Sequence, residues 1–295
     1  MKQYLNLLEY ILANGKRRTD RTGVGTISIF GYQTKYDLRK SFPLITTKRI
    51  GFQTLIKELL WFCRGETNIR RLVSGTVKCN IWNDWPYKAY KQSKDYKGET
   101  MDEFIQKIID DEQFAKIWGE LGPVYGKQWR DFSGVDQLQK AIDTIKNNPD
   151  SRRNIVCAWN PPEIDEMAKK GLPPCHTLFQ FYVDSKAKTL SCQLYQRSGD
   201  SFLGVPFNVA SYAALTCMIA AMTGLKPGEF VHTLGDAHIY LNHVKQVKTQ
   251  LKRKPTKLPI LKFKRIPENI SDWKISDFEL IGYNPQESIK GEVAV

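Results

Sequence analysis

One cysteine in the sequence is placed as a reactive thiol would be. Cys175 directly follows Pro173 and Pro174 and directly precedes the apolar, strand-like run HTLFQFYV. Proline fixes the backbone angle φ and so stiffens the approach to the sulfur. A lone cysteine is most often a small, inert core residue, but the polar sequence QRSGDS at 196–201 suits a cleft better than a core. The sequence therefore predicts that Cys175 is a nucleophile.

A β-hairpin is expected to hold a cation beside this thiol. The segments 176–183 and 189–198 are strand-like, and DSKAK between them has turn character. If the hairpin is centred on Lys186, Cys175 lies opposite Arg197, with Cβ atoms roughly 5 Å apart. A neighbouring guanidinium lowers the pKa of a cysteine and stabilises its thiolate. Arg197 could equally hold an anionic substrate beside the sulfur.

Further arginines stand in contexts that suit a phosphate. Arg21 lies in the glycine-flanked turn RTDRTGVGT, and Arg152 and Arg153 precede a strand. Together with Arg197 and Ser198 they could surround a phosphate, where each charge-assisted hydrogen bond contributes about 1.5–3 kcal/mol. Surface arginines are more often solvated, so this phosphate site depends on the predicted hairpin.

Apolar spacing predicts the elements that position these residues. Helices are expected at 1–14, 51–62, 207–224 and 239–253, and strands at 26–38 and 154–160. The helix at 207–224 is apolar nearly all round, which is typical of a buried central helix. A change of alternation beside Gly31 indicates a β-bulge. Because strands and helices do not alternate regularly, we expect one α+β domain over 1–295, with a small surface helical insertion at about 88–118.

Composition is typical of a globular protein. Of the 295 residues, 41% are hydrophobic and 25% are charged, and no segment has the apolar length of a transmembrane helix. The N-terminal segment lacks the continuous apolar run of a signal peptide. The six cysteines form no Cys-x-x-Cys pair, and the four histidines show no metal-binding spacing. We therefore expect a cytoplasmic protein with reduced thiols and no metal.

The charge of the chain raises an alternative function, nucleic-acid binding. The net charge is +13, and the segment 246–265 is rich in lysine and arginine and holds no acid. Such a segment could bind nucleic acid. Few aromatic residues interleave with the charges, so a solvated helix end and a lysine-guarded edge strand are preferred. Weak RNA binding stays open as a secondary property.

Long motifs in a fixed order resemble one known family. They are TTKR, ELLWF, IWNDW, LGPVYGKQWR, SRRNIV, LPPCHTLFQF, QRSGDSFLGVPFNVASYA, DAHIYLNH and the closing GEVAV. Their order and spacing are similar to those of the thymidylate synthases. The resemblance runs from the first helix to Val295 and is weakest over about 88–118.

The resemblance implies an enzyme that converts dUMP to dTMP. Carbon and hydride would come from 5,10-methylenetetrahydrofolate, which leaves as dihydrofolate. Cys175 would add to C6 of the uracil, Glu58 would organise water and shuttle protons, and Tyr125 would position the water that removes the C5 proton. The implied catalytic residues also include Arg197, Asp200 and Asn208.

The resemblance also implies which residues contact the two substrates. The nucleotide is expected to contact Arg21, Arg152, Arg153, Gln196, Arg197, Ser198, Gly199, Asp200, Asn208, His238, Ile239 and Tyr240. The folate is expected to contact Trp82, Trp85, Asp200, Gly204 and Ala294. Among these, Asp200 would hydrogen-bond the pterin ring, and His238 and Tyr240 would bind the deoxyribose 3′-hydroxyl. Gly199 departs from the family, in which many members have cysteine.

Asn208 would select the base. An amide both donates and accepts, which matches the N3–H and O4 of uracil. The related dCMP hydroxymethylases carry aspartate at this position and are the alternative on the same scaffold. Asparagine here favours dUMP, because a buried polar group that meets the wrong partner costs about 1–3 kcal/mol.

The family also implies a homodimer with shared sites. The bulged, mixed β-sheet would pack against a second copy, and Arg152 and Arg153 would reach the phosphate in the partner's site. The last residues, Ala294 and Val295, would close over the bound folate and exclude water.

Overall fold

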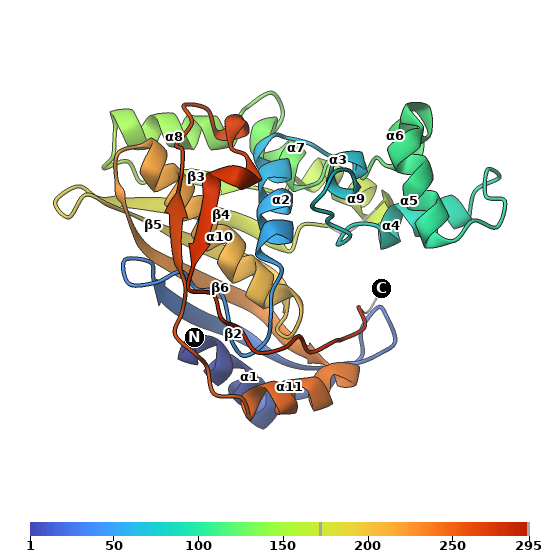
Figure 1. Ribbon diagram of the computed structural model, residues 1–295, viewed down its shortest axis with the longest axis horizontal. Coiled ribbons are helices and arrows are strands. Elements are labelled where there is room, and N and C mark those ends of the chain that lie inside the picture. Colours follow the sequence, from blue (N-terminus) through green and yellow to red (C-terminus); the bar gives the residue numbers. More distant parts are fainter. Residues whose placement is uncertain (171–172, 294–295) are drawn as a thin grey trace.

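The centre of the fold is a mixed six-stranded sheet (Figure 1). The computed structural model describes residues 1–170 and 173–293. In order across the sheet, the strands are β1 (Lys16–Arg18), β2 (Thr26–Asp37), β6 (Lys226–Tyr240), β5 (Thr189–Asp200), β4 (His176–Asp184) and β3 (Ile155–Cys157). β5 and β6 are parallel, and the other neighbouring pairs are antiparallel. This arrangement confirms the predicted α+β class.

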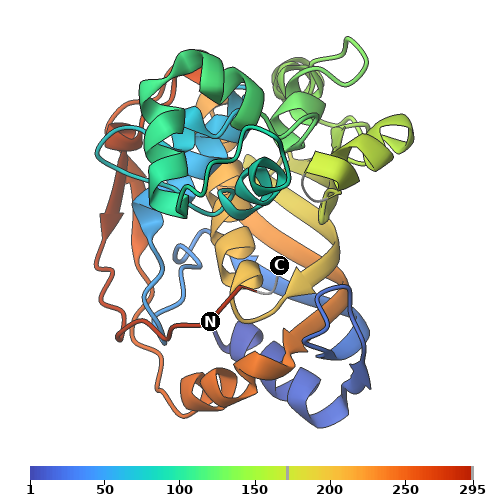
Figure 2. The same ribbon diagram turned by 90° about the vertical axis from the view of Figure 1, so that its right-hand side faces the viewer.

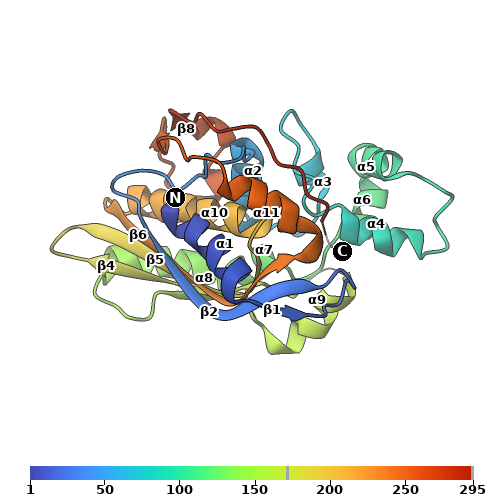
Figure 3. The ribbon, with the colours of Figure 1, turned by 90° about the horizontal axis from the view of Figure 1, so that it is seen from below.

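One face of the sheet is covered by α1 (Lys2–Asn14) and α10 (Gly204–Met222), with α11 (Val244–Leu251) beside α1 (Figure 3). α10 is the helix that was expected to be apolar all round, and it packs on β5 and β6. By length and hydropathy it would pass for a membrane span, but 78% of that window is buried inside the fold. It is therefore the central core helix. It begins earlier than predicted, at Gly204.

The other face of the sheet is polar and accessible. Gln33 on β2 and Gln193 on β5 both donate hydrogen bonds to the Thr233 hydroxyl on β6. Two large side chains on the same face stay exposed, Tyr182 on β4 at 68% and Ile155 on β3 at 44%. The sheet thus contributes one face to the core and presents the other to its surroundings.

Two further helices connect the sheet to the rest of the chain. α2 (Phe52–Cys63) packs on α10 and on α7 (Tyr125–Arg130). Other elements outside the central sheet are α3 (Arg70–Val73), α8 (Gln137–Asn147), α9 (Ile164–Lys170), β7 (Ile260–Phe263) and β8 (Phe278–Ile281). β7 and β8 form a separate two-stranded sheet. The predicted helix at 51–62 is therefore confirmed as α2, and the predicted N-terminal helix as α1.

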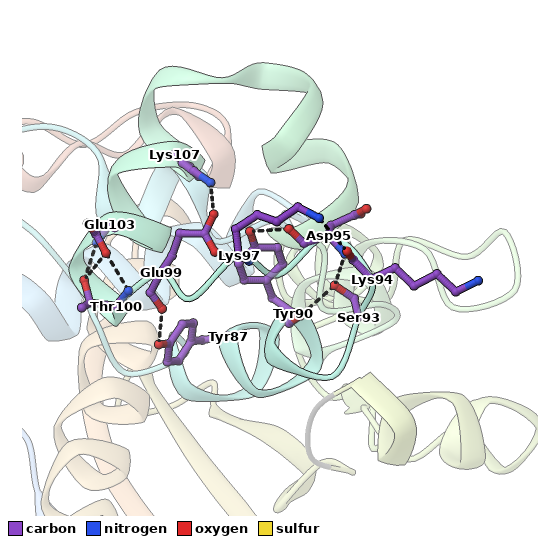
Figure 4. Close-up of polar contacts among 10 residues, drawn as sticks. All are labelled: Tyr87, Tyr90, Ser93, Lys94, Asp95, Lys97, Glu99, Thr100, Glu103 and Lys107. Atoms are coloured by element: carbon purple, nitrogen blue, oxygen red, sulfur yellow. Dashed lines mark hydrogen bonds and ion pairs between the residues drawn. The ribbon is translucent and has the colours of Figure 1, made fainter.

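A lobe of three helices projects from one side of the molecule (Figure 1). It consists of α4 (Asp84–Lys91), α5 (Met101–Asp110) and α6 (Glu112–Trp118), so the helices expected at about 88–118 are present. Tyr90 packs in its centre against Phe104 and Phe114. The loop before α5 is held by an ion pair between Glu99 and Lys107 (Figure 4). The lobe therefore has a small aromatic core of its own.

Two predictions of local structure are wrong. Gly31 has φ +79°, but the β2–β6 register is the same on both sides of it, so no bulge residue is inserted there. The register shifts in the sheet lie between His176 and Leu178 and near Leu190 instead. The helix predicted at 239–253 begins only at Val244, because Ile239 and Tyr240 complete the ladder of β6 with β2 and Leu241–His243 form a 3₁₀ helix.

Candidate functional site

Cys175 lies at the start of β4, beside the end of β5. The backbone N–H of Arg197 donates to the Cys175 carbonyl at 2.9 Å, which confirms the predicted pairing. The pairing depends on the register shift between His176 and Leu178. Without this bulge, the register of the rest of the hairpin would place His176 opposite Arg197. One extra residue in β4 thus brings the thiol beside the arginine.

The Cys175 thiol is half-buried. Its loss of hydration has the largest effect on its pKa. Burial raises the pKa of Cys175, while the positive charges of Arg197 and Arg21 act in the opposite direction. The expected lowering of this pKa by the Arg197 guanidinium is therefore present, but burial outweighs it. Arg197 itself is anchored, because its Nε donates to the Pro174 carbonyl at 2.9 Å and its Nη2 to the Pro173 carbonyl at 2.8 Å. The prolines therefore hold the arginine as well as the cysteine.

Four of the other five cysteines are more buried than Cys175. All six are free thiols. Burial raises the pKa of four of them to about 12, and these are Cys63, Cys79, Cys192 and Cys217. Such thiols are inert near neutral pH. Within residues 1–170 and 173–293, no three His, Cys, Asp or Glu side chains are grouped so that they could hold a metal ion.

Tyr125, the first residue of α7, connects that helix to the thiol. Its hydroxyl accepts hydrogen bonds from the backbone N–H groups of Cys175 at 2.8 Å and His176 at 3.3 Å. Burial raises the pKa of Tyr125 far above its usual value, so the hydroxyl is neutral. Since it accepts both bonds, its own proton is available to donate.

Glu58 is a buried carboxyl on α2. Its Oε1 accepts a hydrogen bond from the indole N–H of Trp82 at 2.7 Å, and only 9% of the residue is exposed. Burial raises the pKa of Glu58 to about 7, although the bond from Trp82 acts in the opposite direction. The ring of Trp82 lies 5.6 Å from that of Trp85 and 6.1 Å from that of Tyr125. Trp82, Trp85 and Tyr125 thus form one aromatic cluster, to which the Glu58 carboxyl is hydrogen-bonded through Trp82.

Asn208 lies at the start of α10, against the end of β5. Nε2 of Gln196 donates to Asn208 Oδ1 at 3.1 Å and to the Ser198 carbonyl at 2.9 Å. A Cβ added at Gly204 would lie 3.6 Å from Asn208 Oδ1 and 3.8 Å from the Cβ of Asp200, so the helix approaches β5 closely here. The structure therefore brings together five residues of the expected site, which are Gln196, Ser198, Asp200, Gly204 and Asn208.

Asp200 ends β5 and shapes the turn into α10. Its Oδ1 accepts from the backbone N–H groups of Phe202 at 2.9 Å and Leu203 at 3.3 Å. Lys48 is buried nearby, and its Nζ donates to the Phe202 carbonyl and lies 3.6 Å from the centre of that ring. Burial lowers the pKa of Lys48 to about 7, while the charge of Asp200 acts in the opposite direction. The sequence reasoning missed Lys48, although the TTKR motif contains it.

The end of β6 contributes His238, Ile239 and Tyr240. His238 Nδ1 lies within hydrogen-bond distance of Asp236 Oδ1, at 2.9 Å. Burial raises the pKa of Tyr240 to about 12, and the charges of Asp200 and Arg21 also act on it. The side chain of Ile239 is fully buried in the core, so only its backbone is available to a ligand.

Gly199 fits the packing of this chain. A Cβ at position 199 would lie 2.8 Å from Leu234 Cδ2 and 3.1 Å from Val205 Cγ2. A cysteine, which many members of the similar family carry, would require these side chains to move. The backbone is therefore the part of residue 199 that faces the site.

Two expected residues, Arg152 and Arg153, lie apart from this cluster. Arg152 and Arg153 are exposed and precede β3, and the Arg152 carbonyl accepts from the Gln180 side chain at 3.2 Å. Gln180 pairs with the start of β3, well along β4 from Cys175. Within one chain, the two arginines are therefore not brought to the thiol. Ala294 lies outside the described residues.

Comparison with known proteins identifies one family. A family model described as thymidylate synthase matches residues 2–295. Thymidylate synthases of Mycoplasma mobile and Mycoplasma pneumoniae are 57% and 55% identical to the chain, with both partners covered over their full length. That of Listeria monocytogenes serotype 4a is 51% identical, again with complete coverage of both. The chain therefore belongs to the thymidylate synthase family, the methyltransferases that convert dUMP to dTMP with 5,10-methylenetetrahydrofolate.

Proposed function

We propose that Cys175 is the nucleophile of this reaction and that its sulfur adds to C6 of the uracil ring. The addition makes C5 an enolate-like carbanion, which attacks the carbon supplied by the folate. Covalent attachment divides a difficult step into easier ones, because the C5–H of a pyrimidine is not acidic enough to be lost unaided. The observation that carries this assignment is the pairing of Cys175 with Arg197 at the bulged start of β4.

Glu58 and Tyr125 handle protons in this proposal. A pKa of about 7 lets Glu58 exist in both protonation states near neutral pH, which a residue that shuttles protons to uracil O4 and the folate nitrogens requires. The neutral Tyr125 hydroxyl accepts from the backbone beside Cys175, so its proton can orient the water that removes the C5 proton.

The nucleotide lies, in this proposal, along the ends of β5 and β6. The Asn208 amide, held by Gln196, faces the N3–H and O4 of the base. His238 and Tyr240 bind the deoxyribose 3′-hydroxyl from the end of β6. The phosphate lies near Arg21, Arg197 and Ser198. The two arginines are close enough to Cys175 for both charges to act on the thiol.

The folate, as cosubstrate, lies between α2 and the β5–α10 turn. Trp82 and Trp85 offer aromatic surface, and Asp200 and Gly204 line the opposite side. The C-terminal segment already reaches this turn (Figure 2), since a Cβ at Gly291 would lie 2.9 Å from the Phe202 ring. In the proposal, Ala294 then closes over the folate.

The functional unit of the proposal is a homodimer formed through the polar face of the sheet. That face combines a hydrogen-bonded ladder of glutamine and threonine with the exposed Tyr182 and Ile155. Arg152 and Arg153 stand exposed at the β3 side of this face, where they are free to reach the phosphate in the partner's site. Each site would therefore contain residues of both chains.

We place this activity in the cytoplasm, supported by six free thiols. RNA binding remains a secondary hypothesis. The lysines of 246–265 are exposed on α11, on β7 and between them, as a solvated surface would be. RNA binding predicts an affinity that falls steeply between two salt concentrations, which a titration measures.

The experiment that tests the proposed function is mass spectrometry after incubation with 5-fluoro-dUMP and methylenetetrahydrofolate. The fluorine cannot leave as a proton does, so the covalent intermediate accumulates. We expect one adduct that contains both compounds, on the peptide that carries Cys175. The matched control is Cys175→Ser, which should give none. An adduct on another cysteine, or none in the wild type, refutes the assignment.

A further inference from the structure

The polar network behind Asn208 extends to a residue that the sequence did not single out. His232 lies on β6 and is fully buried. Its Nε2 is 2.9 Å from Oε1 of Gln196, the residue whose amide also contacts Asn208. In the described part of the chain, Nδ1 of His232 has no hydrogen-bond partner. Within the described residues, the His232 side chain therefore hydrogen-bonds to Gln196 alone.

The Ser198 carbonyl decides how this network is oriented. A carbonyl oxygen only accepts, so the Gln196 atom that lies 2.9 Å from it is the amide nitrogen. Gln196 Oε1 therefore faces His232, whose Nε2 must carry the hydrogen. The second hydrogen on Gln196 Nε2 points to Asn208, whose facing atom is Oδ1 at 3.1 Å. One carbonyl thus determines two amide orientations and one histidine tautomer.

The neutral imidazole ring of His232 has a single N–H donor. Burial lowers the pKa of His232 to about 3, so the ring is neutral and carries one N–H and one acceptor. The ring stacks on Phe230, with centroids 5.8 Å apart, which restrains its rotation. The one N–H is therefore committed to Gln196 Oε1, which would otherwise be a buried acceptor without a donor, since Gln196 is only 2% exposed.

The orientation of Asn208 matters because uracil and cytosine present opposite patterns at N3 and C4. Uracil offers a donor and an acceptor, whereas cytosine offers an acceptor and a donor. An asparagine that rotates its amide by half a turn matches either base. Here a rotated Asn208 would turn its NH₂ group toward the NH₂ group of Gln196. Two donors would then face each other, which disfavours the rotamer that accepts cytosine.

We propose that His232 is a positioning residue for base selection. Its Nε2–H locks the Gln196 amide, and the locked amide keeps Asn208 in the orientation that accepts uracil and rejects cytosine. The inference deepens the proposed function, because it depends on Asn208 as the residue that contacts the base.

The test compares two substitutions of His232. His232→Phe has a ring of similar size and no N–H, whereas His232→Gln places an amide donor near the position of Nε2. The ratio of kcat/KM for dUMP to kcat/KM for dCMP is measured for each. We expect Phe to lower this ratio about tenfold, as the loss of one buried hydrogen bond implies. Gln should restore most of the ratio.

A matched control is Val231→Ala, which changes the residue next to His232 on β6, where side chains alternate between the two faces of the sheet. It should leave the ratio unchanged even where it lowers stability. The inference is overturned if His232→Phe keeps the wild-type ratio, or if Val231→Ala lowers it equally. The variant Asn208→Asp separates the two proposals, because a failure of Asn208→Asp to shift the ratio contradicts the role of Asn208 itself.

A second measurement covers the case in which His232→Phe does not fold. Nitrogen-15 NMR spectra of the wild-type enzyme with labelled histidine report which ring nitrogen carries the proton. We expect the His232 proton on Nε2 and none on Nδ1, at all pH values at which the enzyme is folded. A proton on Nδ1 would leave Gln196 Oε1 without its donor and would overturn the inference.

Discussion

The chemistry of single residues in this protein depends on how much water the fold removes from each of them. Four fully buried cysteines have a pKa of about 12, whereas Cys175 is half-buried and close to two guanidinium groups. The same loss of hydration raises the pKa of Glu58 to about 7. One effect thus makes most thiols inert near neutral pH and brings the pKa of a buried carboxyl close to neutrality.

At this scale we predict that Cys175→Ser abolishes turnover and largely keeps dUMP binding. A serine hydroxyl keeps the size of the side chain but is a far weaker nucleophile than a thiolate. Turnover is measured by release of dihydrofolate and binding by calorimetry. Near-normal turnover in this variant would exclude the covalent route.

Glu58→Gln should change how stability depends on pH. Between pH 4.5 and about 7, the folded protein keeps a proton on Glu58 that the unfolded chain has lost. Stability therefore falls as the pH rises through this window. The wild type should lose up to about 3 kcal/mol relative to Glu58→Gln across this window. Denaturant unfolding at about pH 5 and about pH 8 measures the difference, and parallel curves for the two proteins would contradict the raised pKa.

Asn208→Asp should move substrate preference toward dCMP. A carboxyl group that replaces the amide presents a different set of donors and acceptors to the base, and the mismatch with uracil costs about 1–3 kcal/mol. The ratio of kcat/KM for the two nucleotides should therefore fall by roughly tenfold or more. An unchanged ratio would show that another residue selects the base.

Elements position these residues through two local devices. The bulge at the start of β4 sets Cys175 opposite Arg197. The first residue of α7, Tyr125, accepts hydrogen bonds from the backbone on the C-terminal side of the prolines. The hairpin and α7 therefore hold Cys175 between them, and both devices act on backbone atoms.

Tyr125→Phe tests the second device. The change leaves the N–H of Cys175 without its partner, and an unsatisfied buried donor costs about 1–3 kcal/mol of unfolding free energy. We expect this loss in denaturant unfolding, together with a lower kcat. Tyr10→Phe is the matched control, since Tyr10 is 47% exposed and should change neither quantity. Equal effects of the two substitutions would show that the Tyr125 hydroxyl has no specific role in holding Cys175.

At the scale of the whole molecule, the two faces of the central sheet have different surroundings. One face forms the core with α10, and the other keeps a polar surface with exposed Tyr182 and Ile155. Arg152 and Arg153 lie at that second face rather than beside Cys175 of the same chain. In the proposed homodimer, a second copy on this face would bring its Arg152 and Arg153 to the partner's site.

Mixing two impaired variants tests the shared site, at a dUMP concentration at which Arg152→Ala alone has little activity. Arg152→Ala should weaken dUMP binding, and Cys175→Ser should abolish turnover. In a mixed dimer, one site combines the intact cysteine of one chain with the intact arginine of the other. Random mixing should therefore restore about a quarter of wild-type activity. No recovery, with mixed dimers verified by mass spectrometry, would confine each site to one chain.

The sequence by itself determined the local elements and singled out Cys175 as the expected nucleophile. The hairpin of β4 and β5, the core helix α10 and the N-terminal helix follow from apolar periodicity, which is a local property of the chain. Cys175 is marked by its own neighbours, two prolines before it and a polar strand end opposite it. Long motifs in order then indicated the family.

Only the tertiary structure decided the properties that depend on packing between distant segments. The absence of a bulge at Gly31 and the true start of α11 follow from the ladder of β2 with β6. The raised pKa of Cys175, the buried Lys48 and the contact of His232 with Gln196 all arise where separate elements remove water from a side chain. Hydration and hydrogen-bond partners are set by neighbours in space, and those neighbours are distant in the sequence.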